Sequence, residues 1–505
     1  MRCSSRQERS QQLLDINKRW SKMTQTIAVE PRTGRSTPII ALLLLSGITL
    51  DIQYGILAPL IGVIATESGL TGSEIGWVLN ALMMGSVISV SLTARMGDIF
   101  GHRKVLIALI VLALVGCALG ATADGFWPLV AGRFLMGLAV TIPLSWGLLR
   151  PRATARQIRL VSLVLSTVMA VLVPLALIAG GLIVGLGLPW ETVFWVTFAL
   201  YGVMLILALK SPETPAAARA VVQLDWFGAL GLGVWVTALL VGIAEGPGQG
   251  WTSPLVLGAF LVSAVTLAAW IIQQRRTQEP LVSFRNMDIR QTLIGYSGIL
   301  LISLVGQGIF IVLPAWLQTP ASSGYGHGLS ALDSSYVLLA MIPGAALGYL
   351  WTRWGLRRLG PKTVLVVSGS AAVLVFLGLA LAHGHVWLSW LWVFLYALTI
   401  LSCLTTGYTL VAAAGRQDNM AVTVGMQNII QFVGAMIAVA IILNVLVPGA
   451  DGFIPEATFA GIYIASAVII AVFVIVWAVL APKRITDLHA VDTETDPTKV
   501  HVASH

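Results

Sequence analysis

The sequence predicts an all-α protein that crosses a membrane many times, on the basis of three observations. First, the 505 residues are 57% hydrophobic and only 10% charged, which is much less charge than soluble domains carry. Second, the chain contains many mostly apolar segments of about 18 residues or more, the length that crosses a hydrocarbon core of about 30 Å. Third, lysine and arginine gather in alternate gaps between those segments, which is the positive-inside pattern of cytoplasmic loops.

Fourteen spans account for this pattern. With that count, 29 of the 30 lysines and arginines fall in tails or gaps on one side, and the gaps on the other side contain none. We therefore expect a multi-pass protein of the inner (plasma) membrane with both termini in the cytoplasm. Thr71 and Glu74 have the spacing of a helix capping box at the start of the second span. The expected spans are 38–62, 74–94, 105–123, 127–149, 159–186, 190–209, 226–245, 252–273, 292–317, 332–352, 363–382, 386–410, 421–447 and 458–480.

Two polar tails flank the spans. Residues 1–37 contain eight lysines and arginines and no apolar stretch of the kind found in signal peptides, which predicts a disordered cytoplasmic tail. Residues 481–505 are expected to form a second cytoplasmic tail. The formal net charge of +8 is spread over tails and loops, and this distribution argues against nucleic-acid binding.

The turn between the second and third spans, Gly97–Lys104, places an acid, two glycines and two bases between apolar runs. The spacing Asp-x-x-Gly-x-Arg-Lys, which begins at Asp98, resembles the loop 2–3 signature of the major facilitator superfamily of transporters. The resemblance implies a cytoplasmic gate in which Asp98 holds two helical bundles together in the outward-facing state. The alternative is a turn-forming aspartate without a gating role. The residues of the expected gate are Gly97, Asp98, Gly101, Arg103 and Lys104.

Further stretches resemble the fourteen-helix drug:proton antiporter branch of that superfamily. Leu50–Pro59 is similar to its Leu-Asp…Ala-Leu-Pro motif, although it is one residue shorter. Gly132–Gly137 is similar to its Arg-x-x-Gln-Gly motif, with Met136 in place of glutamine. Asp225–Gly228 resembles the start of its seventh span. In the fifth span, Ala176–Leu177 stands where the branch has Gly-Pro.

The resemblance covers roughly residues 40–480 and implies the major facilitator fold. The expected domains are a six-helix bundle at 38–209, two extra central helices at 226–273 and a second six-helix bundle at 292–480. A weak internal repeat agrees with two parallel bundles. Shifting the sequence by 259 residues places Gly360–Lys362 on Gly101–Arg103, so the second half carries a degenerate copy of the turn.

Only two charged residues lie clearly inside the predicted spans, Asp51 and Arg133. An unpaired charge in hydrocarbon is costly, so such residues are functional candidates. Counted from the helix starts at about 1.5 Å per residue, both lie roughly 10 Å below the outer surface and could meet. We expect this pair to couple transport to protons; a fixed structural ion pair is the alternative.

Uncharged polar residues within the spans are candidates for lining a central cavity, because lipid would leave their hydrogen bonds unsatisfied. Interhelical hydrogen bonding is the alternative at each position. The cavity candidates are Gln53, Tyr54, Asn80, Gln307, Asn428 and Gln431. Glycines and prolines within spans suit close helix packing and kinks. The candidates for that role are Gly137, Pro174, Gly180, Gly181 and Pro343.

Together these features predict a secondary active transporter, not an enzyme, and the resemblance implies proton-coupled export of amphipathic drugs or antibiotics by alternating access. A dedicated metabolite or lipid transporter, for export or import, is the first alternative, and a membrane-embedded enzyme is a remote one. The chain has three scattered cysteines and no nucleotide-binding glycine motif, so we expect no metal and no cofactor. The expected partners are a small-molecule substrate, protons and the lipid bilayer, without nucleic acid, and the chain is expected to be a monomer.

Overall fold

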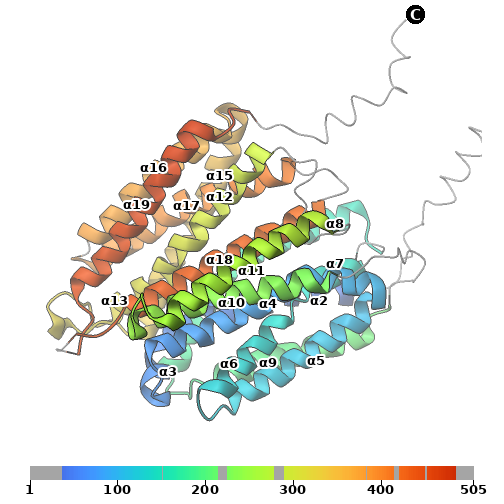
Figure 1. The fold of residues 1–505 in the computed structure, drawn as a ribbon, viewed down its shortest axis with the longest axis horizontal. Helices are drawn as coiled ribbons and strands as arrows, with labels where there is room; N and C mark the ends of the chain where they lie inside the picture. The colour runs from blue at the N-terminus through green and yellow to red at the C-terminus, as the bar shows by residue number, and fades with distance from the viewer. Residues whose placement is uncertain are drawn as a thin grey trace, which may run out of the picture.

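The regular structure of the described chain is helical, with no strand among the described residues. The helices run side by side in one elongated bundle (Figure 1). The predicted tails, 1–37 and 481–505, lie almost entirely outside the part of the chain that is described. The computed structural model describes residues 37–149, 152–213, 225–277, 289–382, 384–414, 420–449 and 452–484.

The first six predicted spans form one group of helices around a hydrophobic cluster that includes the fully buried Leu106, Leu144 and Phe194. Two of these spans are broken into shorter helices. The first span breaks after Gly55, and the 3-10 turn that follows contains Pro59, which has no backbone N–H to donate. The helices are α2 (Thr37–Gly55), η1 (Ala58–Leu60), α3 (Ile61–Ser68), α4 (Gly72–Phe100), α5 (His102–Ala121), α6 (Phe126–Leu138), α7 (Ile142–Leu149), α8 (Ala155–Gly185) and α9 (Thr192–Lys210).

The last six predicted spans form a second group around its own cluster, in which Trp316, Phe376 and Tyr463 are buried. Two of these spans are also interrupted, one by a π-helical turn (η3) and one by a 3-10 turn (η5). The helices are α12 (Ile289–Gln307), η3 (Gly308–Val312), α13 (Leu313–Gln318), η4 (Ala321–Ser323), α14 (Ala331–Val337), η5 (Leu338–Ala340), α15 (Met341–Arg358), α16 (Pro361–Leu381), α17 (Val386–Ala414), α18 (Met420–Val445) and α19 (Glu456–Leu480).

The two extra helices, α10 (Trp226–Gln249) and α11 (Pro254–Arg276), form a hairpin beside α4 and α18 (Figure 1). A third hydrophobic cluster joins Leu232 of α10 to Val87 of α4 and Met436 of α18. α10 therefore covers one seam between the two six-helix groups, while α11 packs mainly on α10.

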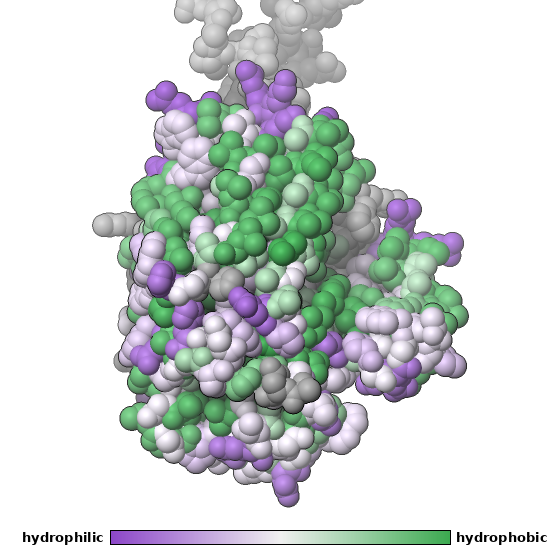
Figure 2. Space-filling model, turned by 90° about the vertical axis from the view of Figure 1, so that its left-hand side faces the viewer, coloured by the Kyte–Doolittle hydropathy of each residue, from purple (hydrophilic) through white to green (hydrophobic). Residues whose placement is uncertain are grey.

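The surface of the bundle is hydrophobic over wide areas (Figure 2). Leu261 of α11 and Ile475 of α19, for example, are 64% and 63% exposed, as suits side chains that contact lipid. In the described part of the protein, thirteen segments are long and apolar enough to cross a membrane, each formed by one helix or by consecutive helices. The remaining predicted span, 159–186, lies on α8, where the apolar segment Pro174–Gly185 is shorter than those thirteen.

The two ends of the bundle differ in charge. We call the end with the helix termini Phe100–Lys104, Lys210 and Arg358 the basic face, and the end with Ser68–Gly72 and Val445 the opposite face. At the opposite face, a Cβ on Gly72 of α4 would lie 3.0 Å from the carbonyl oxygen of Leu443 in α18. A Cβ on Gly181 of α8 would lie 2.8 Å from the Cα of Leu332 in α14. Both helix pairs thus approach closely there, and the two groups are in contact at the opposite face.

Candidate functional site

Arg133 lies in α6, inside the first helical group, and is 1% exposed. Its guanidinium donates a hydrogen bond to the backbone oxygen of Gln53 (3.1 Å) and lies 3.5 Å from that of Val78. Carbonyls in the last turn of a helix lack partners within the helix, and α2 ends at Gly55. Arg133 therefore ties the broken end of α2 to α4 and α6.

Asp51 does not meet Arg133 in this conformation. No hydrogen bond or ion pair joins the two side chains, although both belong to the described residues. The Oδ2 atom of Asp51 is buried and has no hydrogen-bond partner. The guanidinium of Arg133 is instead satisfied by the backbone oxygen of Gln53. The expected contact was estimated from depth alone, and depth does not specify the side of the helix.

Three of the cavity candidates are placed by specific contacts. Gln53 donates to the hydroxyl oxygen of Tyr201 (2.6 Å), so it serves packing within the first group. Tyr54 stacks on Phe432 of α18 with ring centroids 5.6 Å apart. Asn80 donates from Nδ2 to the backbone oxygen of Met436 in α18 (3.3 Å). Tyr54 and Asn80 thus lie where the two groups meet.

The candidates from the second group are partly buried. Gln431 accepts a hydrogen bond from the hydroxyl of Tyr408 (2.8 Å), and Gln307 and Asn428 are partly buried.

A cavity of about 10 Å³ lies between α4, α10 and α18 with Asn80 in its wall, which is room for about one water molecule. The side-chain oxygen of Asn80 is buried without a hydrogen-bond partner.

The packing candidates lie at close helix crossings. A Cβ on Gly137 would collide with the backbone oxygen of Leu82, and one on Gly180 with that of Ile56. Pro174 is buried inside α8, and Pro343 lies in the first turn of α15. The contact of Gly181 with α14 differs from these, because it joins one helical group to the other.

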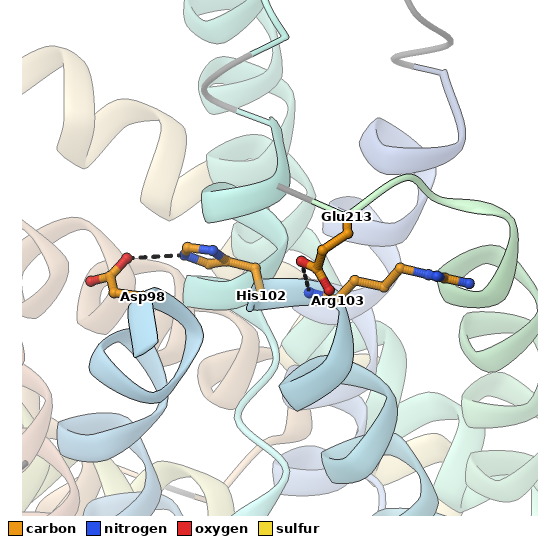
Figure 3. A network of polar contacts seen from close by, with 4 residues as sticks. All are labelled: Asp98, His102, Arg103 and Glu213. Carbon is orange, nitrogen blue, oxygen red and sulfur yellow. Dashed lines mark hydrogen bonds and ion pairs between the residues drawn. The ribbon is translucent and has the colours of Figure 1, made fainter. Parts of the chain in front are cut away.

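The gate residues predicted from the sequence lie together at the basic face (Figure 3). Asp98, near the end of α4, contacts His102 at 3.4 Å; their side chains are 55% and 15% exposed. Gly101 adopts a φ of +98°, a conformation that only glycine adopts readily. A Cβ on Gly97 would lie 2.7 Å from the Leu144 side chain.

The structure adds Glu213, which the sequence did not single out. Figure 3 shows its carboxylate at the N-terminus of α5, where it accepts a hydrogen bond from the backbone N–H of Arg103 (3.0 Å). Partial burial lowers the pKa of nearby Arg152, and the negative charge of Glu213 opposes that effect. No spacing rule marks Glu213, because it lies more than a hundred residues from the turn that it contacts.

The structure also shows hydrogen bonds, not predicted from the sequence, that join the start of α10 to the end of α11. Asp225 caps α10 by accepting from the N–H of Gly228 (2.8 Å). Its carboxylate also accepts from Gln273 (2.8 Å) and Gln274 (2.6 Å) of α11. An aspartate before an apolar run is a recognisable helix start, whereas its glutamine partners carry no sequence signal.

The sequence model of the Major Facilitator Superfamily matches residues 43–439. The chain belongs to the Major Facilitator Superfamily. Solved structures with a similar fold include that of the nucleoside transporter NupG, with a TM-score of 0.59, 15% identity and coverage of 88% of this chain and 98% of that one. The inward-open xylose transporter XylE from E. coli gives a TM-score of 0.56 at 14% identity, covering 90% and 99%.

The curated relatives that match the chain include proteins named for drug resistance and one named for nucleoside transport. Multidrug resistance protein 3 of Bacillus subtilis is 24% identical over 321 residues, covering 62% of this chain and 60% of the relative. The tetracenomycin C resistance and export protein of Streptomyces glaucescens is 26% identical over 302 residues, covering 59% and 54%. The uridine/deoxyuridine transporter of Lactococcus lactis is 23% identical over 397 residues, covering 74% and 78%. The chain thus spans less than two thirds of the two drug-resistance relatives.

Proposed function

We propose that this member of the superfamily exports amphipathic drugs or antibiotics in exchange for protons, by alternating access. Its termini lie in the cytoplasm, so the basic face is the cytoplasmic face and the opposite face is the outer one. The 29-to-0 distribution of lysine and arginine between the two sides supports this orientation. The closed contacts of Gly72 and Gly181 at the opposite face then correspond to a closed outer gate.

The observation that carries the proposal is the carboxyl group of Asp51, which has a buried oxygen without a hydrogen-bond partner. An ionised carboxylate is costly to bury without a partner. Binding or release of a proton at Asp51 therefore changes the free energy of the conformation that buries it. A conformational equilibrium that depends on one proton is what coupled transport requires.

Asp51 also lies on the side of α2 that a substrate between the two helical groups would meet. Asp51 and Tyr54 are three positions apart, so they share one face of the helix. Tyr54 stacks on Phe432 of the second group, and this contact supports an orientation of that face toward the seam between the groups. An acid beside aromatic rings suits an amphipathic compound, and most directly one with a positive charge.

The gate turn completes the proposed mechanism. Asp98 is more than half exposed at the basic face, and the contact described for its side chain is with His102 of the next helix in the same group. We infer that Asp98 engages the second group only when the cytoplasmic side closes. Its charge then stabilises the outward-facing state over the inward-facing one.

A second candidate function is transport of one dedicated metabolite. The uridine/deoxyuridine transporter of Lactococcus lactis aligns over 74% of this chain, a larger share than the drug-resistance relatives reach. A nucleoside would be held by neutral amide side chains such as those of Asn80 and Gln431, rather than by Asp51.

Transport into proteoliposomes distinguishes the two. Purified protein is reconstituted, a pH gradient is imposed, and uptake of a panel of cationic dyes, neutral antibiotics and uridine is recorded. The proposal expects accumulation of one or more amphipathic compounds that disappears when the gradient is collapsed. Accumulation of uridine alone would favour the second candidate and contradict the first.

A further inference from the structure

The second helix of the extra hairpin, α11, is the least buried of the thirteen apolar segments of the described chain. Its outer side carries Leu261, Val265 and Ile272, which are 64%, 58% and 51% exposed. Residues spaced four and seven positions apart share one side of a helix, so these three form a continuous apolar stripe. The stripe is long enough to accompany a lipid acyl chain through much of one leaflet.

The stripe runs toward the basic face. A Cβ on Gly233 of α10 would lie 3.2 Å from the Ile88 side chain of α4. Further along α10, Leu240 shares the small cavity with Asn80, which lies nearer the start of α4. α10 therefore runs opposite to α4, which leads from the opposite face to the basic face. α11 returns from α10 in a hairpin, so it ends at the basic face.

An open groove of about 480 Å³ lies beside the last turns of α11. Its lining changes from apolar to polar toward the end of the helix, through Ala269, Ile272, Gln273, Arg276 and Thr277. A phospholipid changes in the same order, from acyl chain to phosphate. A guanidinium binds phosphate oxygens with two parallel N–H donors, so the polar end of the groove suits a phosphate group.

The arginines at this end have no counter-ion within the described chain. Arg275 and Arg276 are exposed, and neither forms an ion pair with a described residue. The carboxylate of Asp225, which joins α10 to the end of α11, accepts hydrogen bonds from the side-chain amides of Gln273 and Gln274 instead. The groove thus ends in positive charge that a negatively charged lipid headgroup would complement.

Aromatic side chains stand at the same level of the hairpin. Trp226 and Phe227, the first two residues of α10, are 49% and 81% exposed. The bonds of Asp225 hold the start of α10 beside the end of α11, so these rings lie close to the level of the arginines. Tryptophan is enriched where lipid headgroups meet the hydrocarbon core, which agrees with a headgroup at the end of the groove.

We propose that the groove beside the end of α11 binds one anionic phospholipid from the leaflet at the basic face, with its phosphate at Arg276 and an acyl chain along Ala269 and Ile272. The site belongs to the extra hairpin and lies outside the two six-helix groups. The inference is independent of the transported substrate and of proton coupling. Because α10 covers a seam between the two groups, the bound lipid adjoins the element that joins them.

The test uses the full-length protein in detergent micelles with two photoreactive lipids. One is phosphatidylglycerol with a diazirine in its acyl chain, and the other is the matching phosphatidylcholine, whose headgroup has no net charge. After illumination, mass spectrometry identifies the labelled peptides. The variants are Arg276→Gln, which removes the charge in the groove, and Ala269→Phe, which fills its apolar part. Arg357→Gln is the matched control, because Arg357 is also an exposed arginine in the last turn of a helix at the basic face.

We expect phosphatidylglycerol to label the peptide that contains Ala269 and Arg276 at least about fivefold more than phosphatidylcholine does, as one arginine near an anionic headgroup would provide. Arg276→Gln should remove this preference, and Ala269→Phe should reduce labelling by both lipids. Arg357→Gln should leave labelling of this peptide unchanged. Thermal midpoints measured in phosphatidylcholine show that each variant compared is folded.

Three results would overturn the inference. Equal labelling by the two lipids would make α11 an ordinary lipid-facing helix. Loss of labelling in excess inorganic phosphate, but not in chloride at equal ionic strength, would assign the groove to a free phosphate. A dimer in native mass spectrometry that Ala269→Phe dissociates would assign it to a second copy of the chain.

Discussion

Replacing Gly181 with alanine should open the outer gate. The added Cβ would lie 2.8 Å from the Cα of Leu332 and 2.9 Å from the backbone oxygen of Ala331. Backbone atoms cannot rotate away, so α14 would have to retreat by about 0.6 Å to reach the edge of ordinary contact. Overpacking of this kind costs about 1–3 kcal/mol. The cost applies only while α8 and α14 touch, so the closed-to-open ratio should fall by about 5- to 150-fold.

The assay is the distance between spin labels at Thr66 and Ser322, exposed positions at the opposite face in different helical groups. Gly185→Ala is the matched control, because its Cβ would lie 3.8 Å from the Leu332 side chain, an ordinary contact, and it changes helix propensity equally. Gly180→Ala is the second control, since it collides with Ile56 inside the first group and should lower stability without opening the gate. Identical distance distributions for Gly181→Ala and Gly185→Ala would refute the reasoning.

Three other experiments test separate parts of the structure. Asp98→Asn should reduce transport per folded molecule while leaving the thermal midpoint nearly unchanged, because loss of one exposed charge costs at most about 0.5 kcal/mol; unchanged transport would leave Asp98 an ordinary turn residue. Arg133→Met should lower the stability of the detergent-solubilised protein by about 1–3 kcal/mol, since the backbone oxygen of Gln53 loses its buried donor, and an unaltered midpoint would contradict this. In Cys3→Ser protein, an impermeant thiol reagent added outside cells should label Ser323→Cys and spare Thr154→Cys; the reverse pattern would invert the topology.

The fold could be predicted from the sequence because its signals are repetitive and local. Apolar length, alternating basic gaps and the capping box at Thr71 and Glu74 each depend on a few neighbouring residues, and that box is present in the structure. Fourteen expected spans correspond to the helices described here, including the hairpin of α10 and α11. The breaks at Gly55 and at Gly308–Val312 were not predicted, since neither residue type nor spacing fixes where a long helix bends.

The site was harder to predict, because it depends on which way each side chain faces. Depth along the helix placed Asp51 and Arg133 at one level, but Arg133 binds the backbone oxygen of Gln53 and its side chain makes no bond with Asp51. Glu213 was missed because a cap supplied by a distant segment leaves no periodic signal. Tyr54 and Asn80 were selected as cavity candidates because they are polar residues in apolar spans. That role stays a prediction, and the structure shows both in contact with α18.

The central claim is that Asp51 carries the coupling proton, and transport driven by a pH gradient in Asp51→Asn proteoliposomes tests it most directly. Asparagine is nearly isosteric with the protonated carboxyl group but cannot release a proton. Asp124→Asn, at an exposed position in the turn between α5 and α6, is the matched control. We predict that Asp51→Asn binds substrate but no longer accumulates it against a gradient, while the control transports normally. Accumulation by Asp51→Asn at the wild-type level, with the wild-type dependence on pH, would contradict the account.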